Sequence, residues 1–514
     1  MRIQTFLTGL VVALFATAAI VPAPVSAYEA QDLLAKHRAY VGWQFGDGSI
    51  QSLQLERTYT DASGKIKQHA TERRLGLAYR RDFQQVKDYE EGGSSGFTGN
   101  IFWTTNANGF TVPMIGDNAK FYLAIDVLFM EGSSELPAAP QSDQTVDGKS
   151  VHVIRITMNG ALPFDVYEDP QTGAYVRAVI DPGGQLETTI NILSYADLAP
   201  GKKIIGSWSF GSDKGVYAYT KSTVNGPVGA ADLHPPTPSA KWTFANTQPF
   251  KITVTDSRIF VDAKINGVPG HFILDTGASG IALTDAFADR AQLKTVDKSD
   301  AFGIGGTTKT RIRKADTVEI GGNTLSNVVT SSITLDYYNR DEQFDGLMGF
   351  DLFGGAIVNL SLSGATMQIS DPATGPVSPP SGWYPITPDL TDFTPRVPAT
   401  IDDKLQVTAL LDTGGYNLVL LSDQVEHHGI NLLANRQGFL GGNSAIGGVG
   451  GYEITVCGPL AKISVGPFHY TGTEACESRN WDLHQGLIGY DFLKHFDYIF
   501  DYPHGVMYMN PHKD

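Results

Sequence analysis

The C-terminal half of the sequence repeats one pattern, and this duplication constrains the fold more than any other feature. In each copy an apolar run leads directly into Asp-Thr-Gly, within His271–Ser279 and again within Thr408–Tyr416. Each copy then reaches a Gly-apolar-apolar-Gly segment followed by an aromatic residue and an aspartate, at Gly346–Leu352 and Gly486–Phe492. Because both copies keep the same order and similar spacing, the sequence predicts two tandem β lobes.

Two further elements accompany each copy. A turn sequence precedes the apolar run, Asn266–Gly267 in the first copy and Asp402–Asp403 in the second, and it predicts a β-hairpin. A glycine-rich stretch lies between the Asp-Thr-Gly and Gly-apolar-apolar-Gly segments. Its residues are Gly303, Ile304, Gly305 and Gly306 in the first copy and Gly447, Gly448, Gly450 and Gly451 in the second.

The repeat resembles the aspartic peptidases, in which each lobe contributes one Asp-Thr-Gly loop with a psi-shaped strand crossing behind it. The short lobes resemble retropepsin-like more than full pepsin-like lobes, over about Phe250–Asn510. The resemblance implies a mainly β, bilobal protease with Asp275 and Asp412 as its catalytic pair at a pseudo-twofold axis. The glycine-rich stretches would then be flaps over the cleft. The supporting loop residues would be Thr276, Gly277, Thr413 and Gly414, with the two threonines bonded across the axis.

The chemistry expected of such a pair follows from its charge. Two carboxylates within hydrogen-bonding distance cannot both ionise at low cost, so they share one proton. The ionised member accepts a proton from water, and the protonated member donates to the scissile carbonyl. The sequence therefore predicts an aspartic endopeptidase for peptides or unfolded proteins, with neither a metal nor an organic cofactor. The alternative is a catalytically inactive relative that binds peptides or lipoproteins of the cell envelope.

The two loops depart from the usual family pattern after Asp-Thr-Gly. Gly415 and Tyr416 stand where Ala-Ser or Ser-Thr is more common, and Tyr416 either lines a subsite or disturbs the catalytic water. Pepsin-like loops often carry a hydroxyl at the position held here by Ala278 and Gly415. Loss of a donor to the ionised pair raises its pKa, so we expect activity at milder pH.

Two proline-rich stretches divide the chain into domains, because closely spaced prolines oppose helix interiors and central strands. Two lobes in one chain supply both aspartates, so we expect a monomer to be sufficient. The expected units are a signal peptide (1–27), an N-terminal β-rich domain (28–235), a linker (236–248), lobe one (249–371), a proline-rich connection (372–388) and lobe two (389–514).

The N-terminal domain is predicted to be an antiparallel β-sheet after one helix near residues 30–40, since alternating and β-branched runs there are separated by turn sequences. Residues 166–197 resemble periplasmic lipoprotein-carrier domains of the LolA type. Delivery of substrate, regulation of the cleft as a propeptide and an unrelated binding role all stay open. Gly92–Gly96 fits the G-x-S-x-G pattern of serine hydrolases, but no apolar strand precedes it, so we predict a surface loop.

The two ends of the chain indicate an exported protein. Arg2, the apolar run Phe6–Val21 and the small residues Val25–Ala27 form a signal peptide, with a retained helix as the alternative. In an exported chain Cys457 and Cys476 favour a disulfide, with buried free thiols as the alternative. The net charge of -16 argues against a nucleic-acid partner. We therefore expect a periplasmic or secreted protein with no stable membrane span.

Overall fold

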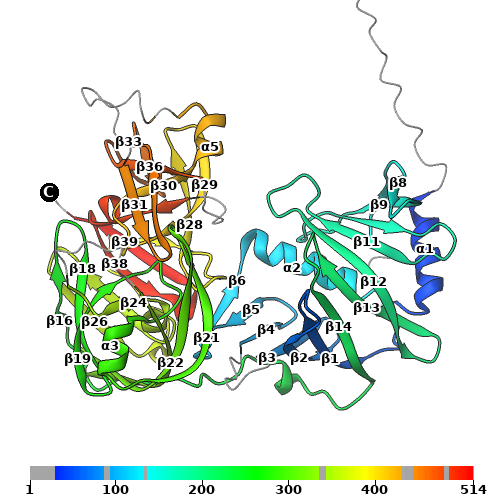
Figure 1. Ribbon diagram of the computed structural model, residues 1–514, viewed down its shortest axis with the longest axis horizontal. Coiled ribbons are helices and arrows are strands. Elements are labelled where there is room, and N and C mark those ends of the chain that lie inside the picture. Colours follow the sequence, from blue (N-terminus) through cyan, green and yellow to red (C-terminus); the bar gives the residue numbers. More distant parts are fainter. Residues whose placement is uncertain are drawn as a thin grey trace, which may run out of the picture.

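The computed structural model describes residues 29–44, 46–85, 93–131, 136–334, 343–430, 432, 444–479 and 486–512. The predicted signal peptide lies outside these residues. The chain forms an N-terminal β domain and two β lobes, so the prediction of a mainly β fold is confirmed (Figure 1). None of the helices within the described ranges is long and apolar enough to cross a membrane.

The N-terminal domain is one antiparallel sheet, as predicted, with the order β6-β5-β4-β3-β2-β1-β14-β13-β12-β11-β10-β9-β7 and β8 beside β9. Helices α1 (Ala30–Val41) and α2 (Gly116–Phe129) pack their apolar residues, such as Leu34 and Phe129, into the same buried cluster as Val166 of the sheet. The strands are β1 (Ser52–Thr60), β2 (Ile66–Leu75), β3 (Ala78–Gln85), β4 (Ser94–Phe97), β5 (Phe102–Thr105), β6 (Thr111–Met114), β7 (Ala138–Pro140), β8 (Gln144–Val146), β9 (Lys149–Ile156), β10 (Phe164–Glu168), β11 (Tyr175–Ile180), β12 (Thr188–Ala199), β13 (Lys202–Phe210) and β14 (Val216–Val224).

Residues Ser94–Gly96 of the G-x-S-x-G segment are part of this sheet, so the prediction of a surface loop was wrong for them, and Gly92 lies outside the described residues. Ser94 begins β4, which pairs with β3 and β5 and is buried along its length. A Cβ atom on Gly96 would lie 2.4 Å from the carbonyl oxygen of Tyr79 and 2.5 Å from the Trp103 ring. Glycine is required here because two neighbours fill the space, and no helix follows the strand to form a nucleophile elbow.

The two lobes share one strand arrangement. In lobe one, β19 leads to Asp275 and pairs in parallel with β24, which also pairs antiparallel with β20. In lobe two, β29 leads to Asp412 and pairs in parallel with β37, which also pairs antiparallel with β30. Lobe one contains β15 (Lys241–Thr243), β17 (Thr253–Val254), β18 (Ile259–Ile265), β19 (Val268–Leu274), β20 (Ala282–Thr284), α3 (Asp285–Arg290), β21 (Lys294–Gly303), β22 (Gly306–Ile320), β23 (Asn323–Ile333), β24 (Gly346–Met348) and α4 (Phe350–Phe353). Lobe two contains β28 (Arg396–Ile401), β29 (Leu405–Leu411), β30 (Leu418–Leu421), α5 (Ser422–His427), β31 (Ser444–Gly448), β32 (Gly451–Thr455), β33 (Cys457–Pro459), β34 (Ile463–Val465), β35 (Phe468–Tyr470), β36 (Glu474–Ser478), β37 (Leu487–Ile488) and α6 (Tyr490–Leu493).

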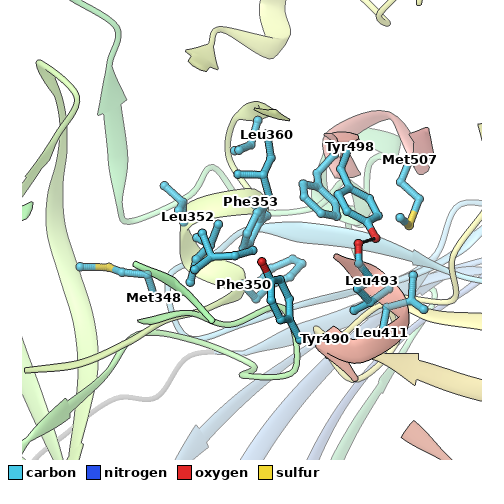
Figure 2. Packing of buried hydrophobic residues seen from close by; sticks show 14 of the residues in the cluster. Met348, Phe350, Leu352, Phe353, Leu360, Leu411, Tyr490, Leu493, Tyr498 and Met507 are labelled. Atoms are coloured by element: carbon cyan, nitrogen blue, oxygen red, sulfur yellow. Dashed lines mark hydrogen bonds between the residues drawn. The ribbon is translucent and has the colours of Figure 1, made fainter. Parts of the chain in front are cut away.

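A third sheet joins the lobes, with the order β16-β26-β25-β38-β39-β27. Strands β25 and β38 pair across the boundary, where Val358 lies opposite Phe500. Figure 2 shows the buried core beside this sheet, in which Phe350 and Phe353 of lobe one lie close to Tyr490 and Tyr498 of lobe two. The strands are β16 (Phe250–Lys251), β25 (Ile357–Ser361), β26 (Thr366–Ser370), β27 (Tyr384–Ile386), β38 (Phe496–Asp501) and β39 (Val506–Pro511).

The two segments predicted as connections also contribute strands. Strand β15 lies within the predicted linker 236–248 and pairs with β23 of lobe one. Strand β27 lies within the proline-rich connection 372–388 and pairs with β39 of the joining sheet. Pro385 fits within β27 because this strand lies at a sheet edge, where one side needs no ladder hydrogen bonds.

The N-terminal domain is packed against the protease half rather than tethered to it. Figure 1 shows that β5 and β6, at one edge of the N-terminal sheet, lie beside the lobes. Phe110, in the turn between these strands, is buried in the core of the lobes, and its ring occupies the space that a side chain on Gly355 would need. Asn118 of α2 donates a hydrogen bond of 2.9 Å to Asp389 near lobe two.

We expect Phe110→Ala to lower the free energy of unfolding of the protease half by about 3–5 kcal/mol, because it leaves a cavity in the shared core. Urea unfolding measures this change. Phe302→Ala is the matched control, since the Phe302 side chain is 78% exposed and its removal creates no cavity. Equal stability of the two variants would contradict the packing described.

Candidate active site

The two Asp-Thr-Gly loops begin where the inner strands of the lobes end. The backbone N–H of Asp275 donates to Met348 over 3.0 Å, and that of Asp412 donates to Ile488 over 3.0 Å. Each loop is therefore fixed at its first residue to the Gly-apolar-apolar-Gly strand of its own lobe. Asp275 is buried and Asp412 is partly exposed.

Thr276 and Thr413 hold the two loops together. The N–H of each threonine donates to the hydroxyl oxygen of the other over 3.1 Å. The Thr276 hydroxyl donates to Leu411 over 2.6 Å, and the Thr413 hydroxyl donates to Leu274 over 2.7 Å. Each buried hydroxyl thus donates once and accepts once. A satisfied network of this kind allows one relative position of the loops.

Gly277 and Gly414 allow the carboxyl groups to approach. A Cβ atom on Gly277 would lie 2.6 Å from the carboxyl carbon of Asp412, and one on Gly414 would lie 2.4 Å from that of Asp275. Any side chain at either glycine would therefore force the two aspartates apart. The sequence motif predicted these glycines to support the active-site loops, and the structure explains why no larger residue fits at either position.

The environment raises the pKa of both aspartates. Burial raises the pKa of Asp275 well above its ordinary value, and the charge of Asp412 and a hydrogen bond between the two groups raise it further. Burial also raises the pKa of Asp412, although Asp275, the N–H groups of Gly415 and Gly414, and the charge of Arg258 act in the opposite direction. The Asp412 carboxylate accepts from Gly414 over 2.8 Å and from Gly415 over 3.0 Å. These contacts favour a shared proton on Asp275 and an ionised Asp412.

Tyr416 is directed toward its own lobe. Its hydroxyl donates to Asp491 over 3.3 Å, and its backbone oxygen accepts from the Asp491 N–H over 2.9 Å. The Lys494 ammonium lies 5.6 Å from the centre of the Tyr416 ring and 2.7 Å from the Asp491 carboxylate. The Tyr416 side chain thus contacts Asp491 and Lys494 of its own lobe.

The glycine-rich stretches form the tips of two hairpins, β21–β22 and β31–β32, which meet each other. The N–H of Gly305 donates to Val449 over 3.1 Å. Ile304 packs against the lobe-two cluster that contains Leu410, and Val449 packs against the lobe-one cluster that contains Ile273. Each tip therefore lies on the opposite lobe, beside the strand that carries the opposite aspartate. Close contacts between the tips surround Gly303, Gly305, Gly448 and Gly450, and positive φ angles are found at Gly306, Gly450 and Gly451.

Cys457 and Cys476 form a disulfide between β33 and β36. Both cysteines are buried in the lobe-two cluster that receives Ile304. Because β33 follows directly after β32, the disulfide anchors the base of the β31–β32 hairpin to the sheet of its lobe.

Comparison with known proteins identifies the lobes. Two segments, residues 261–352 and 397–492, match the aspartyl protease family. Each lobe therefore contains one segment that matches this family, and the recognition made from the duplicated motif is confirmed. No curated protein matches the chain.

Among solved structures, a DUF1329 family protein from Desulfovibrio piger ATCC 29098 is similar at 12% sequence identity, over 40% of this chain and 95% of its own, with a TM-score of 0.30. A likeness at this TM-score carries no argument about the N-terminal domain. The resemblance of that domain to lipoprotein carriers stays a prediction.

Two groups of residues near the loops were not found from the sequence. Arg258 lies in no motif and directly precedes β18. Its charge partly offsets the rise that burial causes in the pKa of Asp412. Asn106 and Asn108 of the N-terminal domain donate to Asp351 behind the first catalytic loop. No local pattern identifies such residues, because their role depends on contacts between distant parts of the chain.

The raised pKa of Asp275 predicts a pH-dependent cost of folding. As the pH rises above the pKa of unfolded aspartate, the unfolded chain ionises freely while the folded pair keeps its proton, so stability falls. We expect Asp275→Asn to raise the free energy of unfolding at about pH 7, and the difference from wild type to shrink at about pH 4. Urea unfolding at both pH values measures the difference.

Asp491→Asn is the control, and it is expected to change the free energy of unfolding at neutral pH in the opposite direction, by lowering it. Burial would raise the pKa of Asp491, but contacts with Lys494, Glu474 and Tyr416 outweigh it and lower the pKa. Its carboxylate therefore stabilises the fold at neutral pH, and this contribution is lost as the pH falls through the folded-state pKa. A destabilised Asp275→Asn variant at neutral pH would contradict the assigned environment of the pair.

Proposed function

We propose that this protein is an aspartic endopeptidase that hydrolyses peptide bonds with Asp275 and Asp412. The observation that carries the proposal is the meeting of two Asp-Thr-Gly loops, locked by Thr276 and Thr413, in which the glycine of each loop lies against the aspartate carboxyl group of the other. Two lobes of the aspartyl protease family supply these loops in one chain.

The mechanism follows from the unequal surroundings of the two aspartates. Asp412, which is partly exposed and lies in the field of the Arg258 charge, is the ionised member that takes a proton from the attacking water. Asp275 keeps the shared proton and donates it to the scissile carbonyl oxygen. The flap tips meet across the cleft, so a peptide enters when they part, and their return excludes bulk water.

The same proposal includes the location and the substrate class. A disulfide between Cys457 and Cys476 persists in an oxidising compartment, which supports a periplasmic or secreted protein. The joining sheet unites both lobes within one chain, which supports a monomer with an internal pseudo-dimer. We propose peptides or unfolded proteins as substrates, because two β-hairpin flaps suit an extended chain.

We expect Asp275→Asn and Asp412→Asn each to reduce the kcat for cleavage of an unfolded-protein substrate by at least about 100-fold, because each variant removes one half of the acid–base pair. A statine-type inhibitor is expected to block the wild type. Cleavage products resolved by mass spectrometry measure the activity and give the peptide preference.

Asp262→Asn is the matched control, because Asp262 is exposed on β18 and contacts His271 rather than the pair. This control is expected to keep wild-type activity. A wild type that binds the inhibitor yet cleaves no peptide would overturn the endopeptidase proposal in favour of the catalytically inactive peptide-binding relative.

We expect the pH optimum to lie above the range typical of pepsin-like enzymes, since Ala278 and Gly415 supply no hydroxyl to the ionised pair. Ala278→Ser restores a hydroxyl on the loop that carries Asp275. It is expected to lower the apparent pKa of the pair and to shift the alkaline limb of the kcat profile toward acid. A wild-type optimum near that of pepsin-like enzymes, or an unchanged limb in the variant, would contradict this expectation.

A further inference from the structure

Each lobe has one aspartate directly after its Gly-apolar-apolar-Gly segment, and the two are supported differently. In lobe two, Asp491 accepts from Lys494 over 2.7 Å, from Tyr416 over 3.3 Å and from the N–H of Glu474 over 3.2 Å. All of these partners belong to lobe two itself.

Lobe one lacks the corresponding side chains. Gly354 stands where lobe two has Lys494, and Ser279 stands where lobe two has Tyr416. A Cβ atom on Gly354 would lie 2.4 Å from the Phe350 ring, so no longer side chain fits there. Asp351 is nonetheless buried, at 2% exposure. A buried carboxylate needs donors, and they must come from elsewhere in the chain.

The N-terminal domain supplies those donors. In the turn between β5 and β6, the amide groups of Asn106 and Asn108 donate to one oxygen of Asp351 over 2.7 Å and 2.8 Å. Both asparagines are buried. Asn108 also exchanges two hydrogen bonds with the backbone of Val329, of 2.7 Å and 3.0 Å, which fixes the turn to β23 of lobe one.

The other oxygen of Asp351 is bound to the catalytic loop. It accepts from the N–H of Ile281 over 2.9 Å, where the loop that starts at Asp275 ends. The same loop is held at Ala278, whose oxygen accepts from the N–H of Phe350 over 2.9 Å. Asp351 therefore joins the N-terminal turn on one side to the loop of Asp275 on the other.

We propose that Asn106 and Asn108 are positioning residues for catalysis, which hold the Asp275 loop in place through Asp351. This inference rests on the proposed peptidase function, and it makes the N-terminal domain part of the catalytic unit. The domain supplies to lobe one the support that lobe two obtains from Lys494 and Tyr416. Removal of residues 28–235 as a propeptide would take both donors from Asp351, so this role is not compatible with the proposal.

Asn106→Asp is the sharpest test, because it replaces the donating nitrogen with an oxygen of the same size. The retained oxygen still accepts from the N–H groups of Asn108 and Phe110, which shape the turn. The introduced carboxylate then faces the carboxylate of Asp351. Among the described residues, the hydrogen-bond donors to Asp351 are Asn106, Asn108 and Ile281, and none of them is a cation that would offset the charge. Acidic pH adds a proton between the two carboxylates and restores a hydrogen bond.

The expected result is a kcat reduced by about tenfold or more at neutral pH with little change in KM, since the flaps and their clusters are untouched. The ratio of variant to wild-type kcat is expected to rise as the pH falls. Asn106→Ser removes the donor without adding a carboxylate, so its kcat is expected to be low without recovery in acid. This second variant carries the test if the first does not fold.

Asn118→Asp is the matched control. It places a new carboxylate against Asp389 at the same domain boundary, away from the catalytic loop. Its kcat is expected to equal that of wild type at temperatures well below its melting point. A loss of kcat equal to that of Asn106→Asp would show a general effect of a loosened domain boundary and would overturn the proposal.

Hydrogen exchange of the segment 275–281 provides a readout that needs no activity. The Ile281 amide is expected to lose protection in both Asn106 variants and to keep it in Asn118→Asp. Folded Asn106 variants with wild-type kcat and wild-type protection would overturn the proposal. If the wild type cleaves nothing, the proposed peptidase function fails. The hydrogen-exchange data alone then support or refute the proposal that Asn106 and Asn108 hold the Asp275 loop in place.

Discussion

The structure depends on bringing two carboxyl groups together in a largely buried place, which opposes both solvation and charge repulsion. The protein meets this cost with a rigid frame around the pair. Thr276 and Thr413 exchange two hydrogen bonds across the lobe boundary, and each hydroxyl donates to a backbone oxygen of the opposite lobe. Gly277 and Gly414 remove the side chains that would separate the acids. Since neither loop can relax alone, the pair keeps its shared proton.

Two other parts of the molecule support this frame, namely the sheet that joins the lobes and the tips of the two hairpins. The joining sheet and the core in Figure 2 make the two lobes one body, so the loops cannot drift apart as lobes of a loose dimer would. Above the pair, Ile304 and Val449 each pack on the opposite lobe. Because each hairpin tip covers apolar surface of the opposite lobe, neither tip can lift without exposing that surface to water, and the movements of the two tips are therefore coupled.

The pseudo-symmetry of the lobes is broken where the N-terminal domain binds. Lobe two supports Asp491 with its own Lys494 and Tyr416, whereas lobe one has a glycine and a serine there and receives Asn106 and Asn108. Burial raises the pKa of Asp351 to about 6, against the opposing effect of these donors. The N-terminal domain therefore supplies hydrogen-bond donors to Asp351, whereas lobe two supplies the side-chain donors to Asp491 itself.

The sequence by itself determined the lobes, the Asp-Thr-Gly loops, the hairpin turns and the flap tips. These features depend on local patterns, namely apolar runs, turn residues and glycines at fixed spacing, which one stretch of chain is enough to specify. The prediction of a surface loop failed at Ser94–Gly96, because that strand lies between β3 and β5, where Tyr79 and Trp103 crowd Gly96. Only the tertiary structure decided the asymmetry of the catalytic pair, the direction of Tyr416 and the contact of Asn106 with Asp351. Each of these depends on groups far apart in the chain, whose distances are fixed only when the sheets pack.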